Sequence, residues 1–442
     1  MKKTLLIAFA AFLPFATARG QEAPTIEEEI FTAEKTRSGW SIVGLPNISY
    51  TSDNGLKLGA FADLYYYGPD RCDFPTYHHK FSLDIGYSFK GNRYGYFFFD
   101  SFKLIPGVRF TASVEYQSHK SFPFMGFNGM ASPFVESLYY TSVDGKETVS
   151  GYYQMRKDML RIFVDFKGDI LPGLQWAAGL NIWNQVIKDT DWMLRTSEHT
   201  NLLSKYIDSG IISPEEARGG FHVELKGGIN YDTRDNEASP RKGIWAELFL
   251  YGSPDIVRWR NSYLNLSAHF RHYVPLVRDR LTFAYHLAYQ GTLLGEMPFY
   301  MLSNIAVLNL RQVDSDGLGS YTSLRGLRYN RLLGKGYAWT NIELRWFIFD
   351  FDWLGINWGI AANPLFDAGM VVQPYRLDKM IASGNADIYS GISGDKLHCS
   401  AGMGLKLSVD YNFILSVEYA YPFLRRAQDG PGSFAATLNY IF

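Results

Sequence analysis

The sequence predicts an all-β fold, a 16-stranded antiparallel transmembrane β-barrel, and three observations support this prediction. The 442-residue chain begins with a secretory signal, its body alternates between apolar and polar residues, and short and long connections alternate between the segments. No run reaches the ~18 apolar residues that a membrane-spanning helix needs. The net charge of −1 gives no basic surface, so no nucleic-acid partner is expected.

The first residues have the order of a secretory signal peptide. Lys2 and Lys3 precede an apolar stretch from Leu5 to Phe15, and Ala16-Thr17-Ala18 follows as a small-residue cleavage site. The apolar stretch is too short to span a bilayer. We therefore expect a signal peptide over residues 1–20, a polar periplasmic leader over 21–39 and a barrel over 40–442.

The body of the chain alternates with the period of a half-buried strand. In residues 160–167, Leu160 and Ile162 alternate with the charged Arg161 and Asp165. One apolar face and one face with charges of both signs are typical of a strand between lipid and a polar lumen. Because backbone groups in lipid must all be paired, the sheet is expected to close into a barrel.

Sixteen segments have this strand character. They cover residues 44–52, 55–67, 78–90, 93–104, 107–118, 155–168, 173–187, 220–233, 243–252, 261–274, 280–292, 336–349, 355–371, 398–410, 413–423 and 433–442. Short connections follow segments 4, 6, 10, 12 and 14, and long ones follow segments 5, 7, 11 and 13. Short periplasmic turns opposite long outer loops give this alternation. The apolar outer loop from Phe122 to Asn128 is expected to meet a partner or lipopolysaccharide, or to cap the barrel.

The first and last segments carry further signals. Tyr440 and Phe442 share the apolar face of the last segment, and a terminal aromatic residue is a signal by which barrel-insertion machinery recognises its clients. The first segment is short and contains Pro46, which cannot donate a ladder hydrogen bond. We therefore expect the junction between the first and last strands to be weak.

Three local motifs are not explained by the alternation. The first is a turn motif between segments 8 and 9, formed by Asp232, Arg234, Asp235, Pro240 and Gly243. The second is Leu324-Arg325-Gly326-Leu327 in the connection between segments 11 and 12, and the third is Leu365-Phe366-Asp367-Ala368-Gly369 in segment 13. In this order, over roughly residues 40–442, the motifs resemble the BamA/TamA superfamily of outer-membrane proteins, also called the bacterial surface antigen family.

The resemblance implies that the connection between strands 11 and 12 folds into the lumen, where the arginine at its tip meets acidic residues of the wall. Here the arginine is Arg325, and the acidic candidates are Glu343 and Asp367, which alternation places on the lumenal face. A guanidinium can bridge two carboxylates, and Gly326 permits a tight turn. Leu327 stands where the family usually has an aromatic residue.

The resemblance also implies insertion or translocation of protein, or lipid, at the outer membrane. Family members usually carry periplasmic POTRA domains, but only about 20 residues separate the signal from the first strand, so we expect a member without them. A periplasmic or lipoprotein partner is expected to supply chaperone-like domains, beside contacts with outer-membrane lipid and lipopolysaccharide. The alternative function is a passive or selective pore without assembly activity.

The sequence shows no catalytic constellation. It contains neither HExxH nor Gly-x-Ser-x-Gly, so we expect no enzyme, no cofactor and no metal site. His78-His79, His269 and His272 are expected to be polar side chains of the lumen wall. Cys72 is expected in a periplasmic turn and Cys399 near an outer strand end, which is too far apart for a disulfide.

Overall fold

The computed structural model describes residues 36–51, 55–69, 72–73, 77–143, 145–188, 201–237, 239–254, 262–278, 280–306, 317–353, 356–409 and 413–438. The predicted signal peptide, most of the predicted leader, and the terminal Tyr440 and Phe442 lie outside the described residues. None of the helices within the described ranges is long and apolar enough to cross a membrane.

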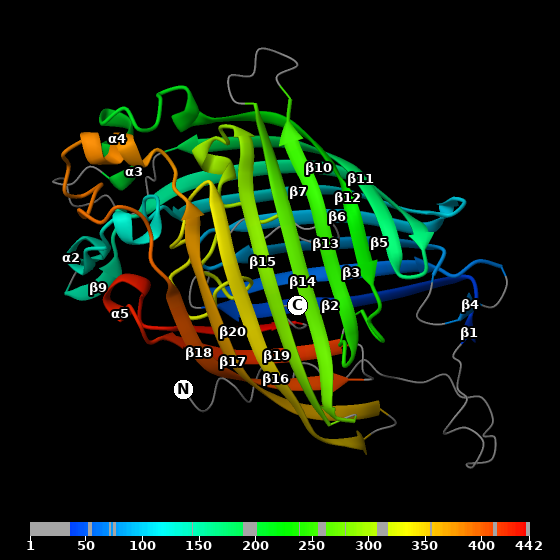
Figure 1. Cartoon of the computed structure of the whole chain (residues 1–442). Helices are drawn as coiled ribbons and strands as arrows, with labels where there is room; N and C mark the ends of the chain where they lie inside the picture. Colours follow the sequence, from blue (N-terminus) through cyan, green and yellow to red (C-terminus); the bar gives the residue numbers. More distant parts are fainter. Residues whose placement is uncertain are drawn as a thin grey trace.

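Sixteen strands in the described part of the chain close into an antiparallel barrel, which confirms the predicted fold class (Figure 1). They are β2 (Trp40–Thr51), β3 (Gly55–Tyr66), β5 (His79–Ser88), β6 (Arg93–Ile105), β7 (Val108–Pro123), β10 (Gln154–Leu171), β11 (Leu174–Lys188), β12 (Gly219–Asp232), β13 (Gly243–Ser253), β14 (Tyr263–Val277), β15 (Leu281–Gly295), β16 (Gly336–Trp353), β17 (Ile356–Gln373), β18 (His398–Val409), β19 (Phe413–Pro422) and β20 (Ser433–Leu438). Each pairs with the next in this order, and β20 pairs with β2.

The wall is polar inside and apolar outside. Along β10, Arg161 and Asp165 are only 1% and 8% exposed, whereas Leu160 and Ile162 are 39% and 36% exposed. Burying these charges requires partners, and Lys226 of β12 places Nζ 2.8 Å from Asp165 Oδ2. This distribution is the reverse of a soluble β-sandwich, and it follows from the alternation of apolar and charged residues along each strand.

The two ends of the barrel differ (Figure 1). One end, the long-loop end, carries α2 (Glu136–Tyr139), α3 (Leu202–Asp208), α4 (Leu377–Ala382), α5 (Arg426–Asp429), the hairpin β8 (Tyr140–Val143) and β9 (Lys146–Val149), and the short helices η1 (Gly129–Ala131), η2 (Glu216–Arg218) and η3 (Phe299–Met301). At the other end, β1 (Thr36–Arg37) pairs with β4 (Cys72–Asp73). Cys399 is the second residue of β18, near the long-loop end, and it is a buried free cysteine.

Long connections pack into an apolar cap over the long-loop end, called the outer cap. Phe122, Phe124 and Phe127 follow or end β7 and are at most 1% exposed. The ring of Phe127 lies 4.5 Å from that of Tyr375 and 5.1 Å from that of Tyr206 in α3. Of the alternatives for the loop from Phe122 to Asn128, the structure shows the capping role, because its aromatic rings are buried in this cluster.

His398, the first residue of β18, fastens the outer cap to the wall. Its Nδ1 lies 2.7 Å from Asp429 Oδ1 in α5, and its Nε2 lies 2.9 Å from Asp395 Oδ1. Asp395 also accepts hydrogen bonds from the backbone amides of Met130 and Val371. Burial acts to raise the pKa of Asp395, but the hydrogen bond and charge of His398 lower this pKa below its usual range. Charge-assisted bonds of this kind hold the cap in one arrangement.

The histidines lie on both faces of the wall. His269 is lumenal, with Nδ1 3.0 Å from His286 Nε2. His272 lies on the opposite face of β14 beside Tyr285, and His79 lies on the outward face of β5. The prediction of a lumenal position is therefore wrong for His79 and His272, because residues an odd number apart in a strand point to opposite faces. Within the described ranges, no group of three or more His, Cys, Asp or Glu is arranged to hold a metal ion.

Candidate functional site

Residues 317–335, the described stretch between β15 and β16 that leads into β16, fold against the inner wall and are called the inward loop. Its Leu324, Leu327 and Leu332 are at most 1% exposed and pack with Tyr337 and Trp339 of β16. Leu327 thus fills a buried position although an aromatic residue is usual there in the family that the sequence resembles. Apolar packing therefore fixes both sides of the loop tip.

Arg325 at the tip forms a bidentate ion pair with Asp367 on β17. Its Nε and Nη2 donate to the two carboxylate oxygens at 2.8 and 2.7 Å, and its backbone amide donates to Oδ2 at 2.9 Å. Nη1 donates to Glu343 Oε1 on β16 at 2.5 Å. Arg325 is 2% exposed and both acids are fully buried. The structure therefore brings together the three residues that the sequence singled out.

Gly326 lets the tip approach the last strands of the barrel. It has a φ of +90°, and a Cβ at this position would lie 2.9 Å from the backbone carbon of Ala420 on β19. Its amide donates to Ser433 Oγ on β20 at 2.9 Å. Ser400 Oγ on β18 donates to the Arg325 carbonyl at 2.5 Å. The tip thus contacts every strand from β16 to β20, and a side chain on residue 326 would push it off the wall.

Comparison with known protein families shows which family this barrel belongs to. The Omp85 superfamily domain matches residues 79–442, which is most of the barrel. The chain belongs to the Omp85 superfamily. This agrees with the predicted resemblance to BamA/TamA proteins, and it places the protein in the bacterial outer membrane. No curated protein matches this Omp85 chain.

Solved structures share the fold of this Omp85 barrel. BamA from Haemophilus ducreyi lacking POTRA domains 1–3 is 16% identical, with a TM-score of 0.55, over 91% of this chain and 70% of that chain. CdiB from Escherichia coli is 11% identical, with a TM-score of 0.52, over 90% of this chain and 62% of that chain. The chain thus spans less than two thirds of the CdiB chain, and these likenesses concern the barrel fold.

Three further charged residues of this Omp85 barrel, which the sequence analysis did not single out, form ion pairs around Arg325. Glu418 on β19 lies 3.5 Å from Nη1 of Arg325, and Lys406 Nζ on β18 donates to Glu418 at 2.6 Å. Arg345 Nε donates to Glu343 at 2.9 Å. Alternation places these residues in the lumen but does not tell which of them face the loop tip. The set, called the lumenal network, comprises Arg325, Arg345, Lys406, Glu343, Asp367 and Glu418.

The predicted turn motif forms the connection between β12 and β13, away from the lumenal network. Arg234 donates from Nε and Nη2 to the two oxygens of Asp232, at 2.9 and 2.6 Å. Asp235 Oδ1 accepts from the backbone amides of residues 241 and 242 at 3.0 and 3.2 Å. Pro240 is buried. The side chains of the motif therefore stabilise the turn to which they belong.

Gly243 allows a test of that turn. Its φ is +108°, and a Cβ would lie 2.3 Å from the carbonyl oxygen of Thr233. We expect Gly243→Ala to lower the free energy of unfolding by about 2–4 kcal/mol, because backbone strain adds to a backbone clash. Gly107 is the matched control, since its φ is +74° and a Cβ there meets nothing within 4 Å. Gly107→Ala should cost only about 1 kcal/mol. Urea unfolding in micelles compares the two variants, and equal losses would contradict the clash.

Proposed function

We propose that this barrel inserts or translocates polypeptide, or lipid, at the outer membrane by opening between β2 and β20. The observation that supports this most is Pro46 in β2, which lacks the amide donor that a ladder needs near the junction of β2 with β20, called the seam. The described residues of the two strands pair Tyr50 with Ala436 and Thr51 with Ala435. Residues 439–442 lie outside the described part of the chain.

A strand junction can separate at modest cost. Each backbone hydrogen bond contributes only about 1 kcal/mol net, and a proline removes one possible donor from the junction. Pro46 interrupts the row of amide donors along β2. A strand edge of this kind can pair with an incoming extended segment. The seam therefore provides both an opening and a template.

The lumenal network supports the same function. Ordering the inward loop costs roughly 1–2 kcal/mol of backbone entropy per residue, and the buried ion pairs of Arg325 offset that cost at the tip. Because the tip contacts β16 to β20, it stiffens one flank of the seam from inside. If β16 to β20 stay in place, β2 can separate from β20 without collapse of the barrel.

The competing function is a passive or selective pore with the inward loop as a constriction. Depletion of the protein in its host, followed by quantitative proteomics of outer-membrane fractions, separates the two. We expect depletion to lower the amounts of particular outer-membrane or surface proteins, and wild-type chain to restore them. A pore instead gives steady conductance in planar bilayers that rises in Arg325→Ala, with an unchanged outer-membrane proteome. That second pattern would overturn the proposal.

We also propose that the protein works with a partner and has no catalytic activity of its own. The partner is a periplasmic protein or lipoprotein with chaperone-like domains, and lipid and lipopolysaccharide surround the barrel. Affinity isolation of the intact complex from outer membranes tests this. We expect a stoichiometric periplasmic component, and isolation of the barrel alone after mild cross-linking would count against it.

A further inference from the structure

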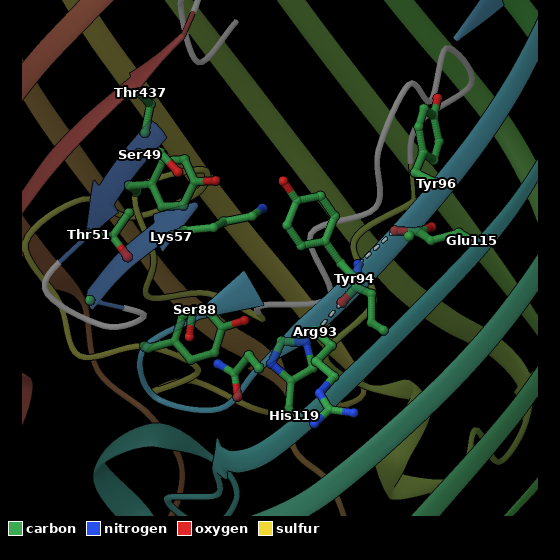
Figure 2. A pocket seen from close by; sticks show the side chains of 16 residues that line it. Ser49, Thr51, Lys57, Ser88, Arg93, Tyr94, Tyr96, Glu115, His119 and Thr437 are labelled. Carbon is green, nitrogen blue, oxygen red and sulfur yellow. Dashed lines mark hydrogen bonds between the residues drawn. The ribbon is translucent and has the colours of Figure 1, made fainter. Parts of the chain in front are cut away.

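A cavity of about 90 Å³ is lined by side chains from β2, β3, β5, β6, β7, β20 and the inward loop (Figure 2). Ser49 and Thr51 of β2 and Thr437 of β20 place it beside the seam. Tyr321 and Tyr329 of the inward loop also line it. The strand ends that contribute to it belong to the long-loop end. The cavity is therefore separate from the ion pairs of Arg325 and is bounded by different strands.

The lining chemistry is selective. Sixteen residues line the cavity, and none of them has an aliphatic side chain. Hydroxyl and amide groups predominate, together with four tyrosines, Tyr94, Tyr96, Tyr321 and Tyr329. An acyl chain would find no apolar wall here. A sugar ring has hydroxyls around its edge and C–H groups on its faces, which match side-chain hydroxyls and amides, and tyrosine rings, respectively.

The polar groups are held in place. Tyr94 donates to Asp84 Oδ1 at 3.0 Å and accepts from Asn47 at 3.3 Å, so its ring is fixed. Figure 2 shows Lys57 directed at Tyr94, with Nζ 3.5 Å from the ring centre. The ring of Tyr96 stacks on Phe98 at 5.8 Å. Groups that are ordered before binding lose less entropy when a ligand arrives.

A second polar row runs along β7. Gln117 donates to Glu115 Oε1 at 2.6 Å, and its Oε1 lies 3.0 Å from His119 Nε2 (Figure 2). The row combines acceptors and donors at two-residue intervals, which is the spacing of one strand face. Lys57 and Arg93 are the cationic groups of the lining, Glu115 is its carboxylate, and Asp84 lies behind Tyr94 beside Lys57. The two cationic side chains are donors that a ligand carboxylate can accept from.

We propose that this cavity is a binding site for a single acidic sugar residue. About 90 Å³ holds several waters at roughly 10–15 Å³ each, which suits one sugar ring and is too small for a folded peptide segment. The site lies near the long-loop ends of β2, β3, β5, β6 and β7, beneath the outer cap. It does not depend on the proposed opening of the seam, because its lining is complete in the closed barrel.

Saturation-transfer NMR on the full chain in an amine-oxide detergent tests the site with galacturonate, galactose and inorganic phosphate as probes. We expect saturation transfer to galacturonate and a weaker transfer to galactose. Lys57→Gln should weaken galacturonate binding about tenfold, because a charge-assisted hydrogen bond is lost, and should leave galactose binding unchanged. Tyr329→Ala should weaken both. Lys103→Gln, which changes an exposed lysine near the opposite end of β6, is the control.

The outcomes are distinct. Absence of transfer to both sugars, or transfer that Lys57→Gln and Tyr329→Ala leave unchanged, would overturn the proposal. Full displacement of galacturonate by equimolar phosphate would also overturn it, because the cavity would then be an anion site without sugar recognition. Heat-modifiable gel mobility shows that each variant is a folded barrel. If Tyr329→Ala fails to fold, Tyr321→Ala removes the second loop ring and gives the same test.

Discussion

Arg325→Ala is expected to release the inward loop and to lower the free energy of unfolding by about 3–5 kcal/mol, the cost of removing one partner from a buried ion pair. The variant leaves the buried Glu343, Asp367 and Glu418 with two cations instead of three. Trypsin digestion of the folded barrel measures the release, because Arg331 in the loop is fully buried in the wild type and becomes a cleavage site when the loop detaches.

Arg109→Ala is the matched control for this experiment. Arg109 makes a bidentate pair with Asp100 through Nε and Nη2, at 2.9 and 2.7 Å, on strands β6 and β7, far along the wall from the inward loop. It should lose stability as well, yet keep the loop protected from trypsin. Arg325→Lys should recover little, because an ammonium cannot copy the planar fork. Wild-type protection of the loop in Arg325→Ala would show that apolar packing alone holds it.

Whereas the partners of Arg325 were implied by the resemblance to the BamA/TamA superfamily, the strand order could be predicted because alternate residues of each strand face different media. Arg161 and Leu160 differ in polarity for that reason, and the same parity places Glu343 and Asp367 in the lumen. Parity does not give the distance between strands that are far apart in sequence. Glu418 lies 93 residues after Arg325, and its approach depends on the closure of the whole barrel.

The packing of the outer cap could not be predicted from the sequence for a related reason. Asn128 donates to the carbonyl of Tyr375, 247 residues away, and this pairing has no periodic signal in either segment. The loop from Phe122 to Asn128 is as apolar as a docking surface would be. Only the arrangement of the other long connections decides that its rings are buried. Hydrophobic loops of a barrel therefore need three-dimensional information before they are assigned to a partner.

A disulfide across the seam is expected to abolish the function that we propose. Thr51 and Ala435 are directly paired, and opposite residues of an antiparallel pair have Cα atoms about 4.5–5.5 Å apart, within the reach of a disulfide. In a background without the native cysteines, Thr51→Cys with Ala435→Cys should form the bond under oxidation. Outer-membrane protein levels should then fall to those of depleted cells, and a reductant should restore them.

Ile48→Cys with Leu58→Cys is the control, because these residues pair between β2 and β3, which stay joined when the seam opens. This bond should form and leave the outer-membrane proteome unchanged, so loss of function in the first pair reflects the seam and not oxidation or barrel damage. Full activity with the seam demonstrably cross-linked would mean that β2 and β20 do not separate during the cycle. Transport through the lumen would then be the remaining route, and the inward loop, not the seam, would have to move.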